Sequence, residues 1–320
     1  MRRLAWILLV IPLIGVVGKL EAQQDSWGNS ILSETFGFSA STPSDVPWEE
    51  VLQGCPQRDC IRSIDKPTFV SAEQATFLEP NDIVIALEID GVSRAYPTRI
   101  LVFHEIVNDS INGNPVLVSY CPLCGSGIIF NRQLGAETVT FGVSGLLHNS
   151  DLIMYDRKTD SLWQQITATS FAGPSRGEKL AIVPSSMTTW SKWRSAHPDT
   201  RVLSTNTGFS KMNYGASPYG DYATNERLMF PVSLSDARRH PKMVVYGAVV
   251  QGQPVAYSSD YIQKHRAFTD ELGGKTVQVE YANDGQVTLS DKDGGRWTGS
   301  RMFWFAWYTF HPDTLLREDG

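Results

Sequence analysis

The sequence has little positive charge and, beyond its leader, no long apolar run. Its 28 lysine and arginine residues are outnumbered by 34 acidic residues, and the formal net charge is −6 at pH 7. An acidic chain without a basic patch is not typical of proteins that bind nucleic acid or anionic lipid. Because no later segment approaches the ~20 apolar residues that a spanning helix needs, we expect no membrane span once the leader is removed.

The first 22 residues have the pattern of a secretory signal peptide. Arg2-Arg3 supply a positive start, residues 4–17 form an apolar stretch, and Leu20-Glu-Ala22 offers a small-residue cleavage site. An uncleaved anchor, the alternative, needs a longer apolar run. No cysteine lies at the cleavage site, which disfavours a lipoprotein. We therefore expect a mature chain that begins near Gln23 and is periplasmic or secreted.

Cysteine is scarce, with four residues in the whole chain. An even number in an exported chain is most simply explained by disulfides. Cys55 and Cys60 enclose a short loop, so we expect a disulfide between them that is dispensable for any metal. A loop this short gains only about 2 kcal/mol of stability in the chain-entropy account. A four-thiolate zinc centre shared with the other two cysteines is the alternative.

The remaining cysteines, Cys121 and Cys124, lie in a Cys-Pro-x-Cys-Gly turn between two β-rich runs, 116–120 and 128–130. Such a turn presents both thiols on one side, and its glycine lets backbone N–H groups point at sulfur. It can hold copper or zinc, a redox-active dithiol, or a structural disulfide. A thioredoxin-like site is disfavoured because a strand, not a helix, follows the turn. A Cys–His hydrolase is disfavoured because a second cysteine adjoins the first in an oxidising compartment.

Short strands separated by turn residues dominate the pattern from residue 83 onward. Asp90-Gly91 and Asn112-Gly113 each predict a two-residue hairpin turn. The expected strands include 83–89, 92–96, 106–111, 116–120, 180–183 and 201–203, and a helix is expected at 187–196. The predicted fold is α+β, mainly β, with short-stranded sandwich or barrel-like units and few short helices.

The second half of the chain repeats the first. Tyr96 and His104 align with Tyr257 and His265 at a constant shift, and the signature Trp-x-x-Trp-x-x-x-His-Pro-Asp-Thr occurs at 190–200 and again at 304–314. In this signature the proline predicts a helix end, and the tryptophans predict core positions. The second copy lacks both the Cys-x-x-Cys turn and the segment 141–151. We infer an internal duplication in which only the first copy carries the special chemistry.

The sequence thus divides into five predicted parts. These are a signal peptide at 1–22, an N-terminal extension with the Cys55/Cys60 loop at 23–80, a unit with the Cys-x-x-Cys turn at 81–205, a Gly/Pro/Tyr-rich connector or lid at 206–240, and a degenerate second copy without cysteines at 241–320.

Several motifs together resemble those of a known family. They are Ala95-Tyr-Pro, His104-Glu-Ile-Val-Asn108-Asp, Tyr120-Cys-Pro-Leu-Cys-Gly-Ser-Gly, Phe141-Gly-Val-Ser-Gly, Asn149-Ser-Asp151-Leu and His197-Pro-Asp-Thr200. On these motifs the chain resembles the domain-of-unknown-function family numbered 3179, whose members are secreted or membrane-anchored prokaryotic proteins. The resemblance is strong over roughly residues 54–203 and weaker in the second half. It implies export and names no reaction.

The hairpin predicted at residues 112–113 brings the His104 end of one strand beside the Cys121 end of the next. Segment 141–151 is the expected third wall of a partly buried pocket. Catalytic candidates are Cys121, Cys124, His104, Glu105 and Asp151; candidate metal ligands are Cys121, Cys124, His104 and His148; the pocket wall adds Asn108, Ser144, Asn149 and Ser150. Since His265 recurs in a copy without cysteines, a structural role for His104 stays open.

Two functional hypotheses follow from these candidates. In the first, Cys121 and Cys124 with His104 bind copper or zinc, or carry out thiol redox chemistry, and both an enzyme and a binding protein fit. In the second, the protein is a non-catalytic secreted binding or structural module whose cysteine turn is a structural disulfide. The expected partner is a small molecule or metal ion, not nucleic acid.

Overall fold

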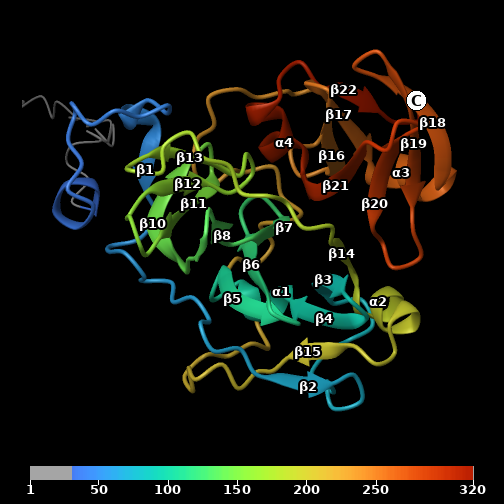
Figure 1. Ribbon diagram of the computed structural model, residues 1–320, viewed down its shortest axis with the longest axis horizontal. Helices are drawn as coiled ribbons and strands as arrows, with labels where there is room; N and C mark the ends of the chain where they lie inside the picture. The colour runs from blue at the N-terminus through green and yellow to red at the C-terminus, as the bar shows by residue number, and fades with distance from the viewer. Residues whose placement is uncertain (1–30, 320) are drawn as a thin grey trace, which may run out of the picture.

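The main regular structure of the chain is a series of short strands, many of which pair with their sequence neighbours (Figure 1). The structure, a computed structural model, describes residues 31–319. The expected signal peptide at 1–22 lies outside the described residues. The mainly β class with few short helices is confirmed. Across residues 31–319 no helix is both long and apolar enough to cross a membrane.

The first copy begins with two hairpins at the predicted turns. β3 (Ile83–Ile89) pairs with β4 (Val92–Pro97), and α1 (Thr98–Leu101) follows directly. β5 (Ile106–Ile111) then pairs with β6 (Asn114–Cys121). Both turns consist of an Asp-Gly or Asn-Gly pair in which the two residues have positive φ, the conformation that a two-residue hairpin requires.

The sheet around β3 is completed by distant segments. β14 (Ser186–Thr189) pairs with β3, and β15 (Arg201–Leu203) lies parallel to β4, with α2 (Trp190–Ala196) between them. β2 (Phe69–Ser71), from the N-terminal extension, forms the edge.

Two details of the sequence prediction are wrong in this region. The helix expected to begin at residue 187 begins at Trp190, because Ser186–Thr189 is committed to the ladder with β3. The strand expected at 180–183 is absent; Ile182 makes an isolated bridge to Phe130 only, and Pro184 has no N–H to extend the pairing.

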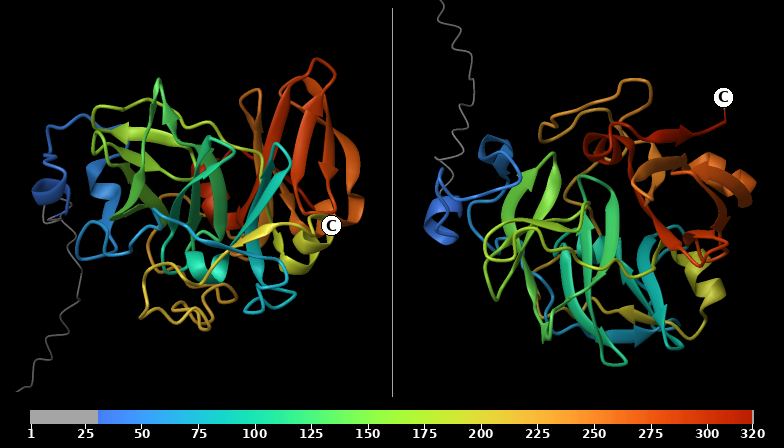
Figure 2. Two further views of the ribbon diagram at one scale, coloured as in Figure 1. Left: turned by 60° about the horizontal axis from the view of Figure 1, so that its bottom comes forward. Right: turned by 45° about the horizontal axis from the view of Figure 1, so that its top comes forward.

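The second copy repeats the first strand for strand. Its elements are β16 (Val244–Val250), β17 (Gln253–Ser258), α3 (Ser259–His265), β18 (Ala267–Leu272), β19 (Lys275–Tyr281), β20 (Val287–Asp291), β21 (Arg296–Phe303), α4 (Trp304–Phe310) and β22 (Leu315–Arg317). Tyr257 pairs across β16–β17 as Tyr96 does across β3–β4, and β22 lies parallel to β17 as β15 does to β4. The predicted duplication is therefore confirmed. These strands curve into one partly closed seven-stranded sheet (Figure 2).

The repeated tryptophan signature has the same contacts in both copies. The indole of Trp193 donates to the Thr200 hydroxyl at 2.9 Å and stacks on His197. The indole of Trp307 likewise donates to Thr314 at 2.8 Å. In each copy the histidine caps the end of the helix, which accounts for the motif as a structural device.

Only the first copy carries an insertion between β7 (Ser126–Asn131), the strand after β6, and β14. It contains β8 (Gln133–Leu134), β9 (Glu137–Thr138), β10 (Phe141–His148), β11 (Asp151–Asp156), β12 (Leu162–Gln164) and β13 (Thr169–Ala172). Strands β10 to β13 form one sheet, and the N-terminal extension adds β1 (Val51–Gln53) to its edge. A short π-helix (Ile31–Thr35) and a 3₁₀ helix (Trp48–Glu50) precede β1. In the second copy, β20 runs into β21 through a short turn instead.

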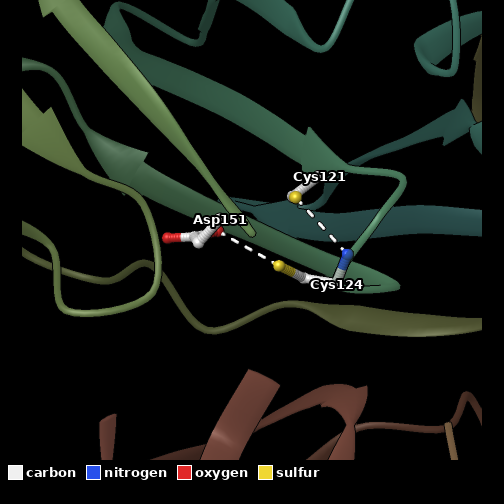
Figure 3. Close-up of side chains that lie close together, drawn as sticks. All are labelled: Cys121, Cys124 and Asp151. Atoms are coloured by element: carbon white, nitrogen blue, oxygen red, sulfur yellow. Dashed lines mark hydrogen bonds between the residues drawn. The ribbon is translucent and has the colours of Figure 1, made fainter. Parts of the chain in front are cut away.

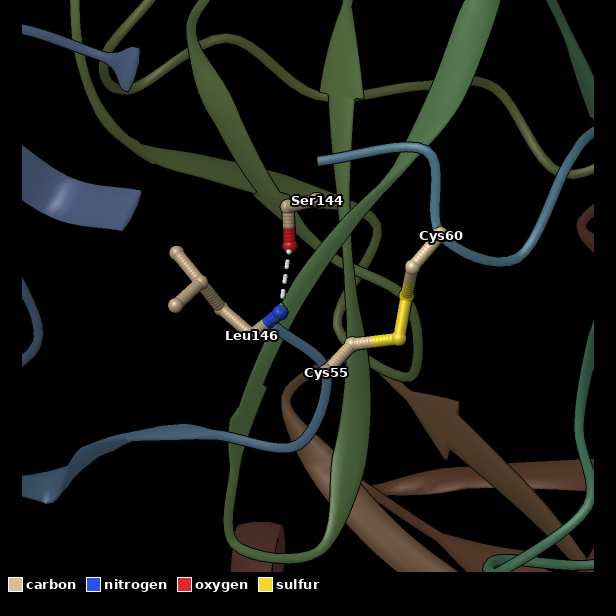
Figure 4. The surroundings of a disulfide bond; sticks show 4 residues. All are labelled: Cys55, Cys60, Ser144 and Leu146. Atoms are coloured by element: carbon tan, nitrogen blue, oxygen red, sulfur yellow. Dashed lines mark hydrogen bonds between the residues drawn. A yellow bond between two sulfur atoms is a disulfide. The ribbon is translucent and has the colours of Figure 1, made fainter. Parts of the chain in front are cut away.

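The expected disulfide between Cys55 and Cys60 is confirmed, with Cα atoms 6.3 Å apart (Figure 4). Its loop lies on the bulge of β10, where the backbone N–H groups of Gly54 and Cys55 donate to the carbonyl of Gly145. Gly145 has φ +83°, and an added Cβ would lie 3.3 Å from Cys55 Cβ. The second glycine of Phe141-Gly-Val-Ser-Gly is therefore needed for this close approach.

Candidate functional site

The cysteine turn joins β6 to β7. Cys121 pairs with Ser126 across the hairpin, and Gly125 takes φ +58° to close it. The backbone N–H of Cys124 points at Cys121 Sγ, 3.4 Å away, as expected for this type of turn. The second copy turns at the same place between β19 and β20, with Ala282 and Gly285 at the positions of the cysteines. The hairpin belongs to the fold, whereas the two thiols are particular to the first copy.

The insertion brings a carboxylate to these thiols. Asn149 and Ser150 form the two-residue turn between β10 and β11, both with positive φ. The turn places the Ser150 carbonyl 3.4 Å from Cys124 Sγ. It also places Asp151 Oδ1 3.5 Å from the same sulfur (Figure 3). The two sulfurs and a carboxylate oxygen of Asp151 all lie within 4.8 Å of one another.

The carboxylate of Asp151 is held in one orientation by its second oxygen. Asp151 Oδ2 accepts a hydrogen bond from Gln164 Nε2 at 2.6 Å and another from the backbone N–H of Ile166 at 3.0 Å. These bonds leave Oδ1 directed at sulfur. In metal sites, hydrogen bonds of this kind hold a ligand carboxylate in a fixed orientation, so Asp151 is positioned as a metal ligand would be.

Burial sets the electrostatics of the cluster. Cys121, Cys124 and Asp151 are all inaccessible to solvent. Burial raises the pKa of both thiols, that of Cys124 strongly. It also raises the pKa of Asp151 to about 6. Each group thus favours its neutral form at this site because the charged form loses hydration.

Glu105, another of the predicted site residues, interacts electrostatically with Cys121 and Asp151. Its backbone carbonyl accepts from the N–H of Tyr120, which fixes it beside the end of β6 as the hairpin argument required. Burial and the charge of Asp151 raise the pKa of Glu105 to about 8. Its carboxylate has no hydrogen-bond partner among the described residues. A buried carboxyl group therefore interacts electrostatically with Cys121 and with a second buried carboxyl group, that of Asp151.

His104, although adjacent to Glu105 in sequence, is not brought to the thiols. Its Nδ1 is 2.7 Å from the carbonyl of Arg62, and its Nε2 is 2.6 Å from the Tyr214 hydroxyl. The chain turns at Glu105, which has φ +56°, and the two neighbouring side chains have different surroundings. With both ring nitrogens occupied, His104 has the contacts of a structural residue.

His148 also lies away from the sulfurs. Its Nδ1 is 2.8 Å from Gln164 Oε1, and its Nε2 is 3.1 Å from Glu50. Since Gln164 in turn donates to Asp151, His148 is two hydrogen bonds removed from the cluster. It supports the group that orients the carboxylate.

The four predicted wall residues divide into two pairs. Asn108 brackets the backbone of Phe141, and the Ser144 hydroxyl donates to the carbonyl of Ile153 within the β10 bulge, so neither contacts a thiol. Asn149 and Ser150 instead tie the connector to the site. Asn149 Oδ1 accepts from the N–H of Ser233, and Ser150 Oγ donates to the carbonyl of Phe230.

Sequence reasoning missed the tyrosines of the connector. Tyr222 is 2% exposed, and its hydroxyl has no hydrogen-bond partner among the described residues. Burial raises its pKa, and the charges of Cys124 and Cys121 add to the effect, as do those of Glu105 and Cys121 at Tyr219. The Gly/Pro/Tyr composition of the connector was the available signal. It predicted a lid without saying which tyrosine turns inward.

The second copy closes the site from the other side. The backbone N–H of Phe303 donates to the carbonyl of Cys124 at 2.8 Å, and both cysteines share a hydrophobic cluster with α4. Three regions far apart in sequence, the β6–β7 turn, the insertion and the β21–α4 junction, therefore enclose one cluster.

Comparison with known families gives one match. The family model described as "Protein of unknown function (DUF3179)" matches residues 58–296, which include the first copy, the whole insertion and the second copy as far as the start of β21. Neither the curated proteins nor the solved structures give a match.

Proposed function

The chain belongs to the DUF3179 family, and we propose that it binds a soft metal ion through Cys121, Cys124 and Asp151. The observation that carries the proposal is the convergence of two thiol sulfurs and one oriented carboxylate oxygen within 4.8 Å. Thiolates with a carboxylate are a donor set found around zinc, whereas copper(I) prefers sulfur alone. Zinc is therefore the first expectation and copper the second.

The crowding of acidic groups supports this proposal. The two thiols and the carboxyl group of Asp151 lie together in a buried region, and the buried carboxyl group of Glu105 interacts electrostatically with Asp151 and Cys121. A bound cation stabilises deprotonated thiols and carboxylates, and metal binding releases their protons. The Glu105 carboxyl group lies outside the three-residue cluster but interacts electrostatically with Cys121 and Asp151, so a bound cation would also favour its deprotonated form.

A dithiol that cycles with a disulfide is the second candidate function. It is favoured by the adjacency of the thiols and by their being unbonded, while Cys55 and Cys60 are bonded. Thiol–disulfide exchange requires an accessible thiolate of low pKa. Both thiols are buried with raised pKa, so metal binding fits the site better.

Metal content and titration test the proposal. We expect protein purified without oxygen to bind one equivalent of zinc or copper(I), and Cys121→Ser, Cys124→Ser and Asp151→Asn each to weaken binding at least tenfold. The double variant Cys55→Ser/Cys60→Ser is the matched control and should bind normally. Equal binding by all variants, together with an unreactive Cys121–Cys124 disulfide in the native protein, would leave the structural module as the correct hypothesis.

A further inference from the structure

A groove lies between the insertion and the sheet of the second copy. Its volume is about 680 Å³, within the range of small-molecule sites. One wall comes from the segment around β13 and residues 179–184, and the other from β16, β21 and α4. It opens to solvent and is separate from the buried thiol cluster.

Large apolar side chains are exposed in this groove, whereas most large apolar side chains of the described residues are not. Ile182 and Val249 are 43% and 40% exposed, and both line it. The three other large apolar side chains of comparable exposure in residues 31–319, Met212, Met229 and Leu234, all belong to the connector. Trp297 and Trp307 add two indole rings to the lining. Apolar surface left open in a rimmed groove marks a binding site.

The charged residues that line the groove are all basic. Lys179 and Arg296 are exposed, and neither side chain has a hydrogen bond or ion pair with any described residue. None of the described lining residues is Asp or Glu. In a chain of net charge −6, this local excess of unpaired positive charge favours an anion.

The duplication supplies an internal comparison. In the first copy, His197 lies 3.1 Å from Glu88 and 3.5 Å from Asp284, and these contacts fill the corresponding place. In the second copy the position of Glu88 is Val249, and the ring of His311 has no hydrogen-bond partner among the described residues. The carboxylate contacts of His197 therefore have no counterpart at His311 among the described residues.

We propose that this groove binds an organic anion with a flat apolar body. The indoles and the exposed Ile182 and Val249 pack against the body, and Lys179 and Arg296 pair with the anionic group. The proposal is independent of the metal centre, although the backbone of Ile166, which lines the groove, also bonds Asp151.

Anilinonaphthalene sulfonate, a fluorescent aromatic anion, is the probe, and the uncharged phenylnaphthylamine is its matched analogue. We expect the native protein to bind the sulfonate more tightly than the uncharged compound. The double change Lys179→Glu/Arg296→Glu should weaken sulfonate binding at least tenfold and affect the uncharged analogue less than twofold. Val249→Glu, which restores the acidic residue of the first copy, should also weaken sulfonate binding, whereas Val249→Thr should not.

Lys292→Glu makes the same kind of charge reversal at one position in the β20–β21 turn outside the groove, so unchanged binding by that variant supports the proposal. Unfolding midpoints equal to that of the native protein confirm that each variant folds. The proposal is overturned if the double variant binds the sulfonate as the native protein does, or if the native protein does not prefer the anion. Cys121→Ser should retain probe binding, so this result is distinguished from failure of the metal centre.

Discussion

Ser150 has a left-handed backbone conformation, with φ 62°, and its carbonyl accepts hydrogen bonds from both thiols. A non-glycine residue in this conformation costs on the order of 1 kcal/mol. The cost is offset by the bond from its hydroxyl to Phe230, and the result is a turn that aims a carbonyl and a carboxylate at sulfur. Backbone strain of this kind collects at functional sites.

At the residue scale, a substitution at Gly125 tests how closely the Phe303 ring of the second copy packs on the cysteine turn. An added Cβ there would come within 2.8 Å of the Phe303 ring, and the residue has φ +58°. Gly125→Ala should therefore lower the free energy of unfolding by roughly 2–4 kcal/mol, from the positive φ and the overlap together. The measurement is urea denaturation followed by tryptophan fluorescence.

Gly135 is the matched control because it has nearly the same φ, +60°, with no atom within 4 Å of an added Cβ. Gly135→Ala should cost only about 1 kcal/mol. Equal losses in the two variants would contradict a close contact between the turn and the second copy.

At the scale of elements, the two copies place the same helix end in different surroundings. α2 ends at His197 between two carboxylates, whereas α4 ends at His311 beside the basic groove. Burial lowers the pKa of His311 to about 4.

His311 should make stability depend on pH. Between its ordinary pKa of 6.5 and the folded value of about 4, the unfolded chain binds a proton that the folded chain does not. Burial of the neutral His311 side chain therefore costs no stability above pH 6.5, and the free energy of unfolding decreases as the pH falls from 6.5 towards 4. His311→Gln should flatten this part of the profile of unfolding free energy against pH, whereas His197→Gln should leave it in place. A native slope in the His311 variant would show that the group is not responsible.

What the sequence predicts at this scale depends on local spacing. The turn sequences Asp90-Gly91 and Asn112-Gly113 were enough to predict the two hairpins. The constant residue shift that aligns Tyr96 and its neighbours with Tyr257 and its neighbours was enough to predict the duplication. Glu105 and Asp151 were predicted beside the thiols because hairpin geometry and the insertion bring them there. His104 was predicted beside them as well, but a single positive φ at Glu105 turns it away, and no pattern of residue types encodes that turn.

The connector is the part that sequence patterns could not place. Between β15 and β16 it has no helix or strand, so it has no periodicity from which an inward face could be predicted. Tyr222 and Tyr219 reach the thiol cluster through long-range packing alone. The boundaries at 206 and 240 and the lid role of this segment stay predictions.

At the scale of the whole molecule, the second copy serves as the cover of the first copy's site. The bond from Phe303 to the carbonyl of Cys124 and the packing of α4 on both cysteines make the two copies interdependent. A chain that ends at residue 240 should therefore expose its thiols. We expect Cys121 and Cys124 to react with a thiol reagent at least tenfold faster in this variant than in the full chain under native conditions.

The full chain with Phe303→Ala is the milder test, because it opens the cover without removing the copy. Intermediate reactivity in that variant would place the protection at the β21–α4 junction. Thiols that stay equally slow to react in both variants would show that the insertion and connector suffice to bury them.

The covering role of Phe303 has a consequence for the order of events during synthesis. The cysteines emerge from the ribosome long before the segment that covers them, since some 180 residues separate Cys124 from Phe303. Throughout that interval the nascent chain presents two open thiols, and only nearly complete translation seals them. If the proposed metal centre forms, an ion that enters while the chain is still growing does not have to displace the tryptophan-rich α4, and the timing of its arrival would decide how readily the centre is filled.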